Sequence, residues 1–157
     1  MPRNFKSTAA LQKPDPKFGS MLATKIINKL MLDGKKSTAQ QIFYQALDIA
    51  QKKLGTETQE EIFETAVENA RPLVEVRSKR VGGANYQVPR EVKRARQQSL
   101  AIRWLVDFSR KKKGKPMAER FAEEIIDAFN GTGQSVQWRE NIHKMAEANK
   151  AYAHYAR

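Results

Sequence analysis

Apolar side chains recur every three or four residues along most of the chain, and this spacing predicts a mainly α-helical fold. Leu22, Ile26 and Leu30, for example, fall on one stripe of a helix, with lysines away from it. Breaks such as Gly55 and Asn130–Gly131 separate the periodic segments. We therefore expect six helices. Five span about residues 20–32, 37–54, 56–69, 117–129 and 134–152, and the fourth in chain order carries Leu100, Trp104 and Phe108.

Local signals refine three of these helices. Residues 37–40 have the S-x-x-Q form of a capping box, which predicts the start of the second helix. The third helix is acidic, so we expect it to face away from a polyanion or toward a basic protein neighbour. In the fourth, Trp104 lies at helical spacing from Leu100 and Phe108, which favours a core residue over a platform for stacking bases.

Between the third and fourth helices the hydrophobic period changes from helical to alternating. Val74 and Val76 alternate with charged residues, and Tyr86 and Val88 alternate in the same way, which predicts two strands. Gly82–Gly83 supplies the positive φ angles that a two-residue turn requires. We expect a β-hairpin at residues 73–90.

Pairing around this turn places cations on both faces of the hairpin. Lys79 lies opposite Tyr86 and beside Arg77 on one face, and Arg80 lies opposite Asn85 on the other. A ribbon that is polar on both faces cannot be buried along its length. We therefore expect an arm that projects from the helices and grips a polyanion. The alternative is an edge hairpin that meets only solvent.

The charge of the chain indicates the class of partner. Lysine and arginine number 29 against 17 aspartates and glutamates, a formal net charge of +12, which favours nucleic acid first and an anionic membrane surface second. No apolar run is long enough for a membrane helix or a signal peptide, so we expect no membrane partner. The absence of cysteine excludes disulfides, cysteine zinc sites and thiol catalysis.

The first residues differ from the rest of the chain. Residues 1–19 show no period and contain Pro2, Pro14 and Pro16 among basic residues, which predicts an extended basic tail that is disordered without a partner. Residues 20–157 are expected to form a single helical domain that carries the arm.

Candidate catalytic chemistry is weak. His143 and Glu147, four residues apart on a helix, could share a metal, but a neighbouring lysine would repel it. We therefore favour a hydrogen-bonded histidine or an RNA contact for His143 over a metal ligand. Residues 34–37 are faintly similar to a phosphate loop, yet Lys29 stands where that motif needs glycine. We expect no enzyme activity, metal, cofactor or small-molecule substrate.

Several basic patches are the candidate nucleic-acid-binding sites, because cations neutralise phosphates and release counterions. They lie in the tail, on the first helix and the turn after it, in the hairpin and at its base, in the loop after the fourth helix, and on the last helix. The predicted contacts are Arg3, Lys17, Lys25, Lys29, Lys35, Lys36, Arg77, Lys79, Arg80, Lys93, Arg94, Arg96, Arg103, Arg110, Lys111, Lys112, Lys113, Lys115, His143, Lys144 and Lys150.

Long strings of the chain resemble one family. They are GKKSTAQQIFYQAL (34–47), EVRSKRVGGANYQVPREV (75–92) and HKMAEANKAYAHY (143–155), with support from SLAIRWL (99–105). In sequence, order and spacing they are similar to small-subunit ribosomal protein seven of bacteria and organelles. The resemblance extends from about Asp15 over nearly the whole chain.

This resemblance implies a six-helix bundle with a protruding ribbon that binds the 3′ major domain of small-subunit ribosomal RNA and nucleates assembly of the subunit head. It also implies a place at the subunit interface on a cytoplasmic ribosome, with an organellar ribosome as the alternative. Its implied partners are exit-site tRNA, mRNA and small-subunit proteins nine and eleven. The part expected nearest tRNA and mRNA is the hairpin tip, Val81, Gly82, Gly83, Ala84, Asn85 and Tyr86.

The chain departs from this family's pattern in two regions. Asn4 and Phe5 stand where more arginines are usual, and Gln137 and Trp138 stand where a basic pair is usual. Ile142 replaces the usual threonine.

The alternative function is that of a DNA-bending architectural protein. The arm of such a protein usually carries a wedge residue at its tip, where this chain has two glycines.

Overall fold

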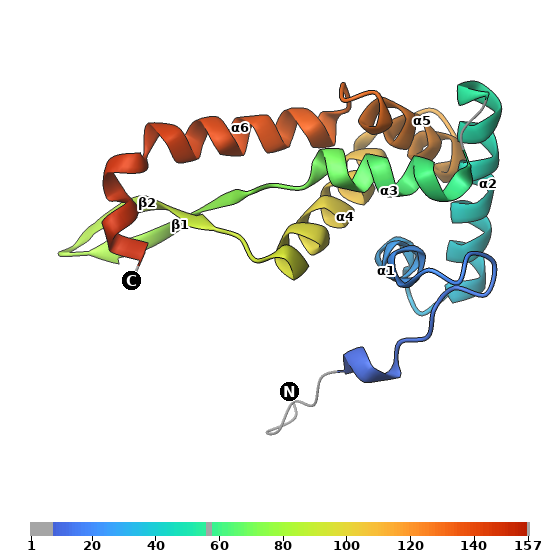
Figure 1. Ribbon diagram of the computed structural model, residues 1–157, viewed down its shortest axis with the longest axis horizontal. Coiled ribbons are helices and arrows are strands. Elements are labelled where there is room, and N and C mark those ends of the chain that lie inside the picture. The colour runs from blue at the N-terminus through green and yellow to red at the C-terminus, as the bar shows by residue number, and fades with distance from the viewer. Residues whose placement is uncertain (1–7, 56–57, 157) are drawn as a thin grey trace.

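The computed structural model describes residues 8–55 and 58–156, and this part contains six α-helices, two short 3-10 helices and one two-stranded ribbon (Figure 1). The prediction of a mainly helical fold with a hairpin between the third and fourth helices is confirmed. The elements are η1 (Thr8–Leu11), α1 (Met21–Leu30), α2 (Lys36–Leu54), α3 (Gln59–Ala70), β1 (Val74–Val81), β2 (Ala84–Glu91), α4 (Arg94–Lys111), α5 (Met117–Phe129), α6 (Gln134–Ala148) and η2 (Lys150–Ala156).

The main core lies among α2, α3 and α5. Phe43, Phe63 and Phe121, one from each helix, are fully buried. The ring of Phe43 lies 5.8 Å from that of Phe63 and 6.4 Å from that of Phe121, centroid to centroid. Truncation of a buried phenylalanine to alanine typically costs about 3–5 kcal/mol. These rings make the bundle a rigid body, onto which α1 and α4 pack.

Helix capping agrees with the sequence at α1 and differs at α2. Ser20 caps α1 and accepts from the backbone N–H groups of Leu22 and Ala23. The capping box expected at residues 37–40 was wrong, because α2 already begins at Lys36 and its N-cap makes no side-chain hydrogen bond. A capping box does occur at α3, where Thr58 and Glu61 cap each other; the expected start at Thr56 lies outside the described residues.

Trp104 belongs to a second, smaller core, as predicted. Its side chain is 9% exposed and packs with Val92 and Leu100, while Phe108 and Ile142 lie against the cluster. These residues come from the segment after β2, from α4 and from α6. The cluster therefore joins the base of the arm to the helical bundle.

The ribbon has the predicted register. Lys79 pairs with Tyr86, and Arg80 with Asn85. Gly82 and Gly83 close the turn with φ angles of 58° and 89°, a region that residues with a Cβ rarely occupy. The strands span residues 74–91, one residue later at each end than expected. Only Val88 of the two strands is buried, so most of the ribbon remains outside the core.

The last helix is shorter than predicted. The expected helix to residue 152 was wrong at its end, since α6 stops at Ala148 and the chain continues as η2. As Figure 1 shows, α6 leaves the bundle alongside the ribbon, and the chain then turns down across the ribbon near its tip. The arm is thus accompanied by the C-terminal segment rather than projecting alone.

The ordered body begins before residue 20. Asp15 is 3% exposed, accepts from the backbone N–H groups of Lys17 and Phe18, and accepts from the Tyr44 hydroxyl at 2.8 Å. The ring of Phe18 packs edge-on against Phe43. Two residues of the expected tail, Asp15 and Phe18, thus contact the helical body; residues 1–7 are outside the described part.

Candidate nucleic-acid interface

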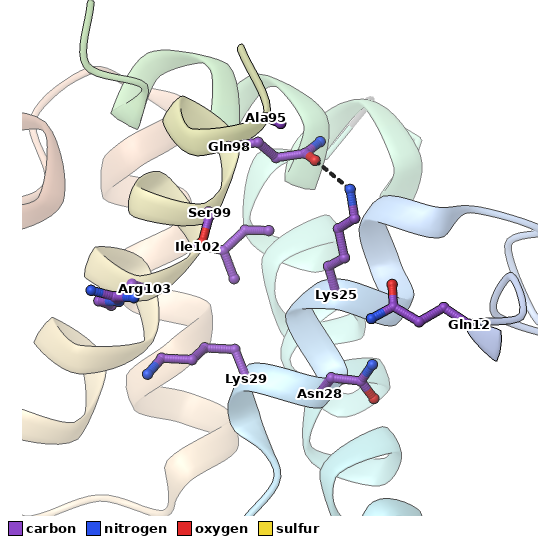
Figure 2. A pocket seen from close by; sticks show the side chains of 9 residues that line it. All are labelled: Gln12, Lys25, Asn28, Lys29, Ala95, Gln98, Ser99, Ile102 and Arg103. Atoms are coloured by element: carbon purple, nitrogen blue, oxygen red, sulfur yellow. Dashed lines mark hydrogen bonds between the residues drawn. The ribbon is translucent and has the colours of Figure 1, made fainter. Parts of the chain in front are cut away.

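A groove between α1 and α4 brings together three of the predicted RNA-binding cations. Lys25 and Lys29 reach it from α1 and Arg103 from α4, as Figure 2 shows. The groove has a volume of about 380 Å³. Its remaining lining residues are Gln12, Asn28, Ala95, Gln98, Ser99 and Ile102.

Helical spacing explains why these side chains meet. Lys25, Asn28 and Lys29 are three and four residues apart, so they share one face of α1. Ser99, Ile102 and Arg103 do the same on α4. Buried Ile102 belongs to the main core, so the cations stand on two helices that are fixed from below.

The positive charge of the groove is not neutralised by acidic side chains in its lining. None of its lining residues is a carboxylate. Lys25 Nζ donates to the uncharged Gln98 Oε1 at 2.7 Å, while Lys29 Nζ lies 3.8 Å from Asp107 Oδ1, just outside the groove. The amides of Gln12, Asn28 and Gln98 add hydrogen-bonding groups beside the charges. Such a surface suits a phosphate–sugar backbone.

At the start of α4, three predicted cations lie on the surface. Lys93, Arg94 and Arg96 are exposed, and Lys93 as N-cap makes no side-chain capping bond. Arg96 forms an ion pair with Glu75 at 3.2 Å, and Arg77 pairs with the same carboxylate at 2.6 Å. Glu75 thus ties the arm to α4 and neutralises part of this patch.

The basic residues at the end of α4 and in the loop after it have mainly internal partners, contrary to their appearance in the sequence. Arg110 donates to the carbonyls of Lys29 and Leu30 at the end of α1. Lys112 Nζ lies 3.2 Å from the buried carboxylate of Glu124. These two cations hold the fold together, which makes them poor candidates for RNA contacts.

Two other cations of this segment, Lys111 at the end of α4 and Lys115 in the loop, have close partners as well. Lys115 pairs with Glu123, and this hydrogen bond raises the pKa of Lys115 and lowers the pKa of Glu123. Lys111 Nζ lies 4.7 Å from the ring centroid of Phe108. Lys113 is exposed.

The other predicted cations are scattered. Lys35 and Lys36 are exposed in the turn before α2, and Lys144 is exposed on α6. Lys17 Nζ lies 3.9 Å from Asp48 Oδ1, and Lys150 Nζ lies 3.5 Å from Glu147 Oε1. These residues do not line the α1–α4 groove. Arg3 lies outside the described residues.

His143 has a structural partner. Its Nε2 accepts a hydrogen bond from the backbone N–H of Leu73 at 3.1 Å, which joins α6 to the start of the arm. Across residues 8–55 and 58–156 there is no group of three or more His, Cys, Asp or Glu side chains that could hold a metal. No helix in the same part of the chain is long and apolar enough to cross a membrane.

Comparison with known proteins decides the family. The model of the family "Ribosomal protein S7p/S5e" matches residues 2–150. The chain belongs to the ribosomal protein S7p/S5e family. It is 52% identical over 153 residues to "Small ribosomal subunit protein uS7" of Fervidobacterium nodosum, covering 98% of both chains. It is 54% identical over 155 residues to the protein of that name from Symbiobacterium thermophilum, covering 99% of both. The resemblance seen in the sequence is thereby confirmed.

In this S7p/S5e member the arm carries a contact that sequence reasoning missed. Tyr86 of β2 lies 5.0 Å from Tyr152 and 5.3 Å from Tyr155 of η2, centroid to centroid. Lys79 Nζ donates to the Tyr155 carbonyl at 2.7 Å. We call these four residues the tyrosine clamp. The clamp covers one face of the arm, whereas Arg80 is exposed on the other face.

Proposed function

We propose that this protein is a structural, non-catalytic component of the small ribosomal subunit that binds ribosomal RNA through the α1–α4 groove. The observation that carries this proposal is the convergence of Lys25, Lys29 and Arg103 in a groove lined by no carboxylate. Family membership and relatives named as small-subunit proteins support the partner. The RNA would be the 3′ major domain, where binding nucleates assembly of the subunit head.

The arm serves a second, later role in this proposal. Its tip, residues 81–86, faces exit-site tRNA and mRNA at the subunit interface, and small-subunit proteins nine and eleven are neighbours. The separation of the tip from the helical core supports this, because an element outside the core can reach a distant partner. The relatives named above are bacterial, which favours a cytoplasmic ribosome over an organellar one.

The test is selection between nucleic acids by the full chain. An RNA fragment of the 3′ major domain and a DNA duplex of equal length compete for the protein at fixed salt, because charge alone does not distinguish them. We expect the RNA to win by at least about tenfold, a difference of about 1.4 kcal/mol. Substitution of Lys25, Lys29 and Arg103 by glutamine should remove most of this binding.

A charge-matched control separates the groove from overall charge. Lys52, Lys53 and Arg90 are exposed, lie outside the groove and are not among the predicted RNA contacts, so their replacement by glutamine removes the same formal charge. This control should keep most of the affinity. Equal loss in both variants, or equal binding of RNA and duplex DNA, would contradict the proposal and favour a charge-driven architectural DNA binder.

A further inference from the structure

The two tryptophans occupy opposite environments. Trp104 is 9% exposed and belongs to the core, whereas Trp138 on α6 is 42% exposed. Only part of the Trp138 side chain is therefore buried against the rest of the protein. Met145, on the same helix, is also 45% exposed, so the outer side of α6 presents two large apolar side chains to water.

Trp138 lies on an uncharged stripe of α6. Gln134, Trp138, Asn141 and Met145 follow one another at intervals of four, three and four residues, and all four are exposed. At about 100° per residue they share one side of the helix. The carboxylates of Glu140 and Glu147 lie about 160–180° away from Trp138 on the same helix. Nothing anionic on α6 thus adjoins the indole.

The indole of Trp138 and the ammonium of Lys111 contact the same phenylalanine of α4. The ring of Phe108 lies 6.2 Å from that of Trp138, at an interplanar angle of 60°. The ammonium of Lys111 lies 4.7 Å from the centroid of the same phenylalanine. Phe108 packs on the small core, so it fixes the position of both neighbours.

From this arrangement we propose that Trp138 is a stacking platform for an unpaired RNA base, with Lys111 neutralising the adjacent phosphate. Aromatic rings stack any base, and a nearby cation meets the backbone that carries it. The amides of Gln134 and Asn141 can bond base edges. An apolar protein partner would use the same indole but would gain nothing from the lysine. The proposal rests on the proposed function, since the groove must first hold the RNA.

The test uses the full chain and an RNA fragment of the 3′ major domain. Trp138→Ala should weaken binding about 5- to 100-fold, the usual loss when a stacking aromatic is removed. Trp138→Phe should retain most of the affinity, because phenylalanine also stacks. Met145→Ala, on the same exposed stripe, is the matched control and should have little effect. Because stacking is not ionic, Trp138→Ala should leave the slope of log K against log salt unchanged.

Fluorescence supplies an independent readout of the same contact. Saturating RNA should quench emission in the Trp104→Phe variant, whose remaining tryptophan is Trp138, and should protect that residue from iodide. Salt-dependent RNA binding with unchanged Trp138 emission and an unaffected Trp138→Ala variant would overturn the stacking proposal alone, and would assign the indole to a protein neighbour. Absence of selective RNA binding by the unmodified protein would overturn the proposed function as well.

Discussion

The α1–α4 groove and the arm are both rich in cations, but their cations stand in different settings. In the groove, Lys25 and Arg103 project from helices fixed on the core, and no carboxylate lines the walls. In the arm, Arg77 pairs with Glu75, and Lys79 donates to the Tyr155 carbonyl. Cations that look alike in the sequence therefore differ in how freely they can bind RNA phosphates.

The two regions also differ in what keeps them ordered. The groove rests on a fully buried core, whereas an isolated two-stranded ribbon is at best marginally stable in water. The arm gains order from its base, through Val88 and Val92, and from the tyrosine clamp near its tip. We infer that the groove supplies affinity while the arm acts as a held but separable probe.

The largest expected effect comes from the residue that joins the two regions. Trp104→Ala should lower the free energy of unfolding by about 3–5 kcal/mol, because it leaves a cavity between α4, α6 and the base of the arm. Chemical denaturation with circular dichroism measures this loss. A change under about 1 kcal/mol would mean that the small core does not couple the arm to the bundle.

Removal of the arm should affect the body much less. Replacing residues 77–87 by a short Gly-Ser turn removes no residue of the main core. Helicity of the bundle and binding to the 3′ major domain should persist, while η2 should lose its contacts with Tyr86 and Lys79. Circular dichroism and an RNA titration test this. Unfolding of the variant, or loss of initial RNA binding, would show that the arm is an anchor.

Release of the clamp should loosen the arm alone. Aromatic pairs contribute about 0.5–1.5 kcal/mol each beyond area burial, so Tyr152→Ala with Tyr155→Ala should raise amide hydrogen exchange in the ribbon by about tenfold. Exchange in α2 and α5 should stay the same. Leu32→Ala, at a side chain that is 62% exposed and lies outside the clamp, is the control. If the ribbon exchanged at the same rate in the double variant and in the unmodified protein, the clamp would be contradicted.

The smallest effect concerns the rim of the groove at high pH. Burial, together with the hydrogen bond to Asp15, raises the pKa of Tyr44 to about 12 from the model-compound value of 10.0. The neutral phenol is thus favoured in the folded state, and its contribution to stability is complete below pH 10. This contribution should fall as the pH rises from about 10 to about 12.

Tyr44→Phe should remove that pH dependence. Asp15 anchors the segment that follows Gln12, so ionisation of Tyr44 should loosen the rim of the groove before the arm. Spectroscopic titration of the phenol gives the pKa directly, and thermal unfolding across the same pH range gives the linked stability. A normal pKa near 10 would contradict the anchored geometry.

Much of the fold follows from local patterns in the chain. Gly82–Gly83 fixes the ribbon register because a two-residue turn leaves one pairing, and the apolar period locates the helices. The end of α6 could not be predicted from the local pattern. Tyr152 continues the helical spacing of apolar residues, although it lies beyond the end of α6. It contacts Tyr86 of the arm, which is remote in sequence.

The candidate site is less completely encoded in local sequence. Lys25, Lys29 and Arg103 are recognisable as cations, but their meeting in one groove is a tertiary result. The amides of Asn28 and Gln98 carry no charge, so a search for basic residues passes over them. Conversely, Lys112 reads as an exposed cation until Glu124 is placed beside it.

The most direct test of this account is the salt dependence of RNA binding in two triple variants. One replaces Lys25, Lys29 and Arg103 by glutamine, and the other replaces Arg77, Lys79 and Arg80. With the 3′ major domain RNA, each lost phosphate contact should reduce the slope of log K against log salt by about 0.7–0.9. The account predicts a decrease of about 2–3 for the groove variant and less than about 1 for the arm variant. An unchanged slope for the groove variant, with a large decrease for the arm variant, would contradict it.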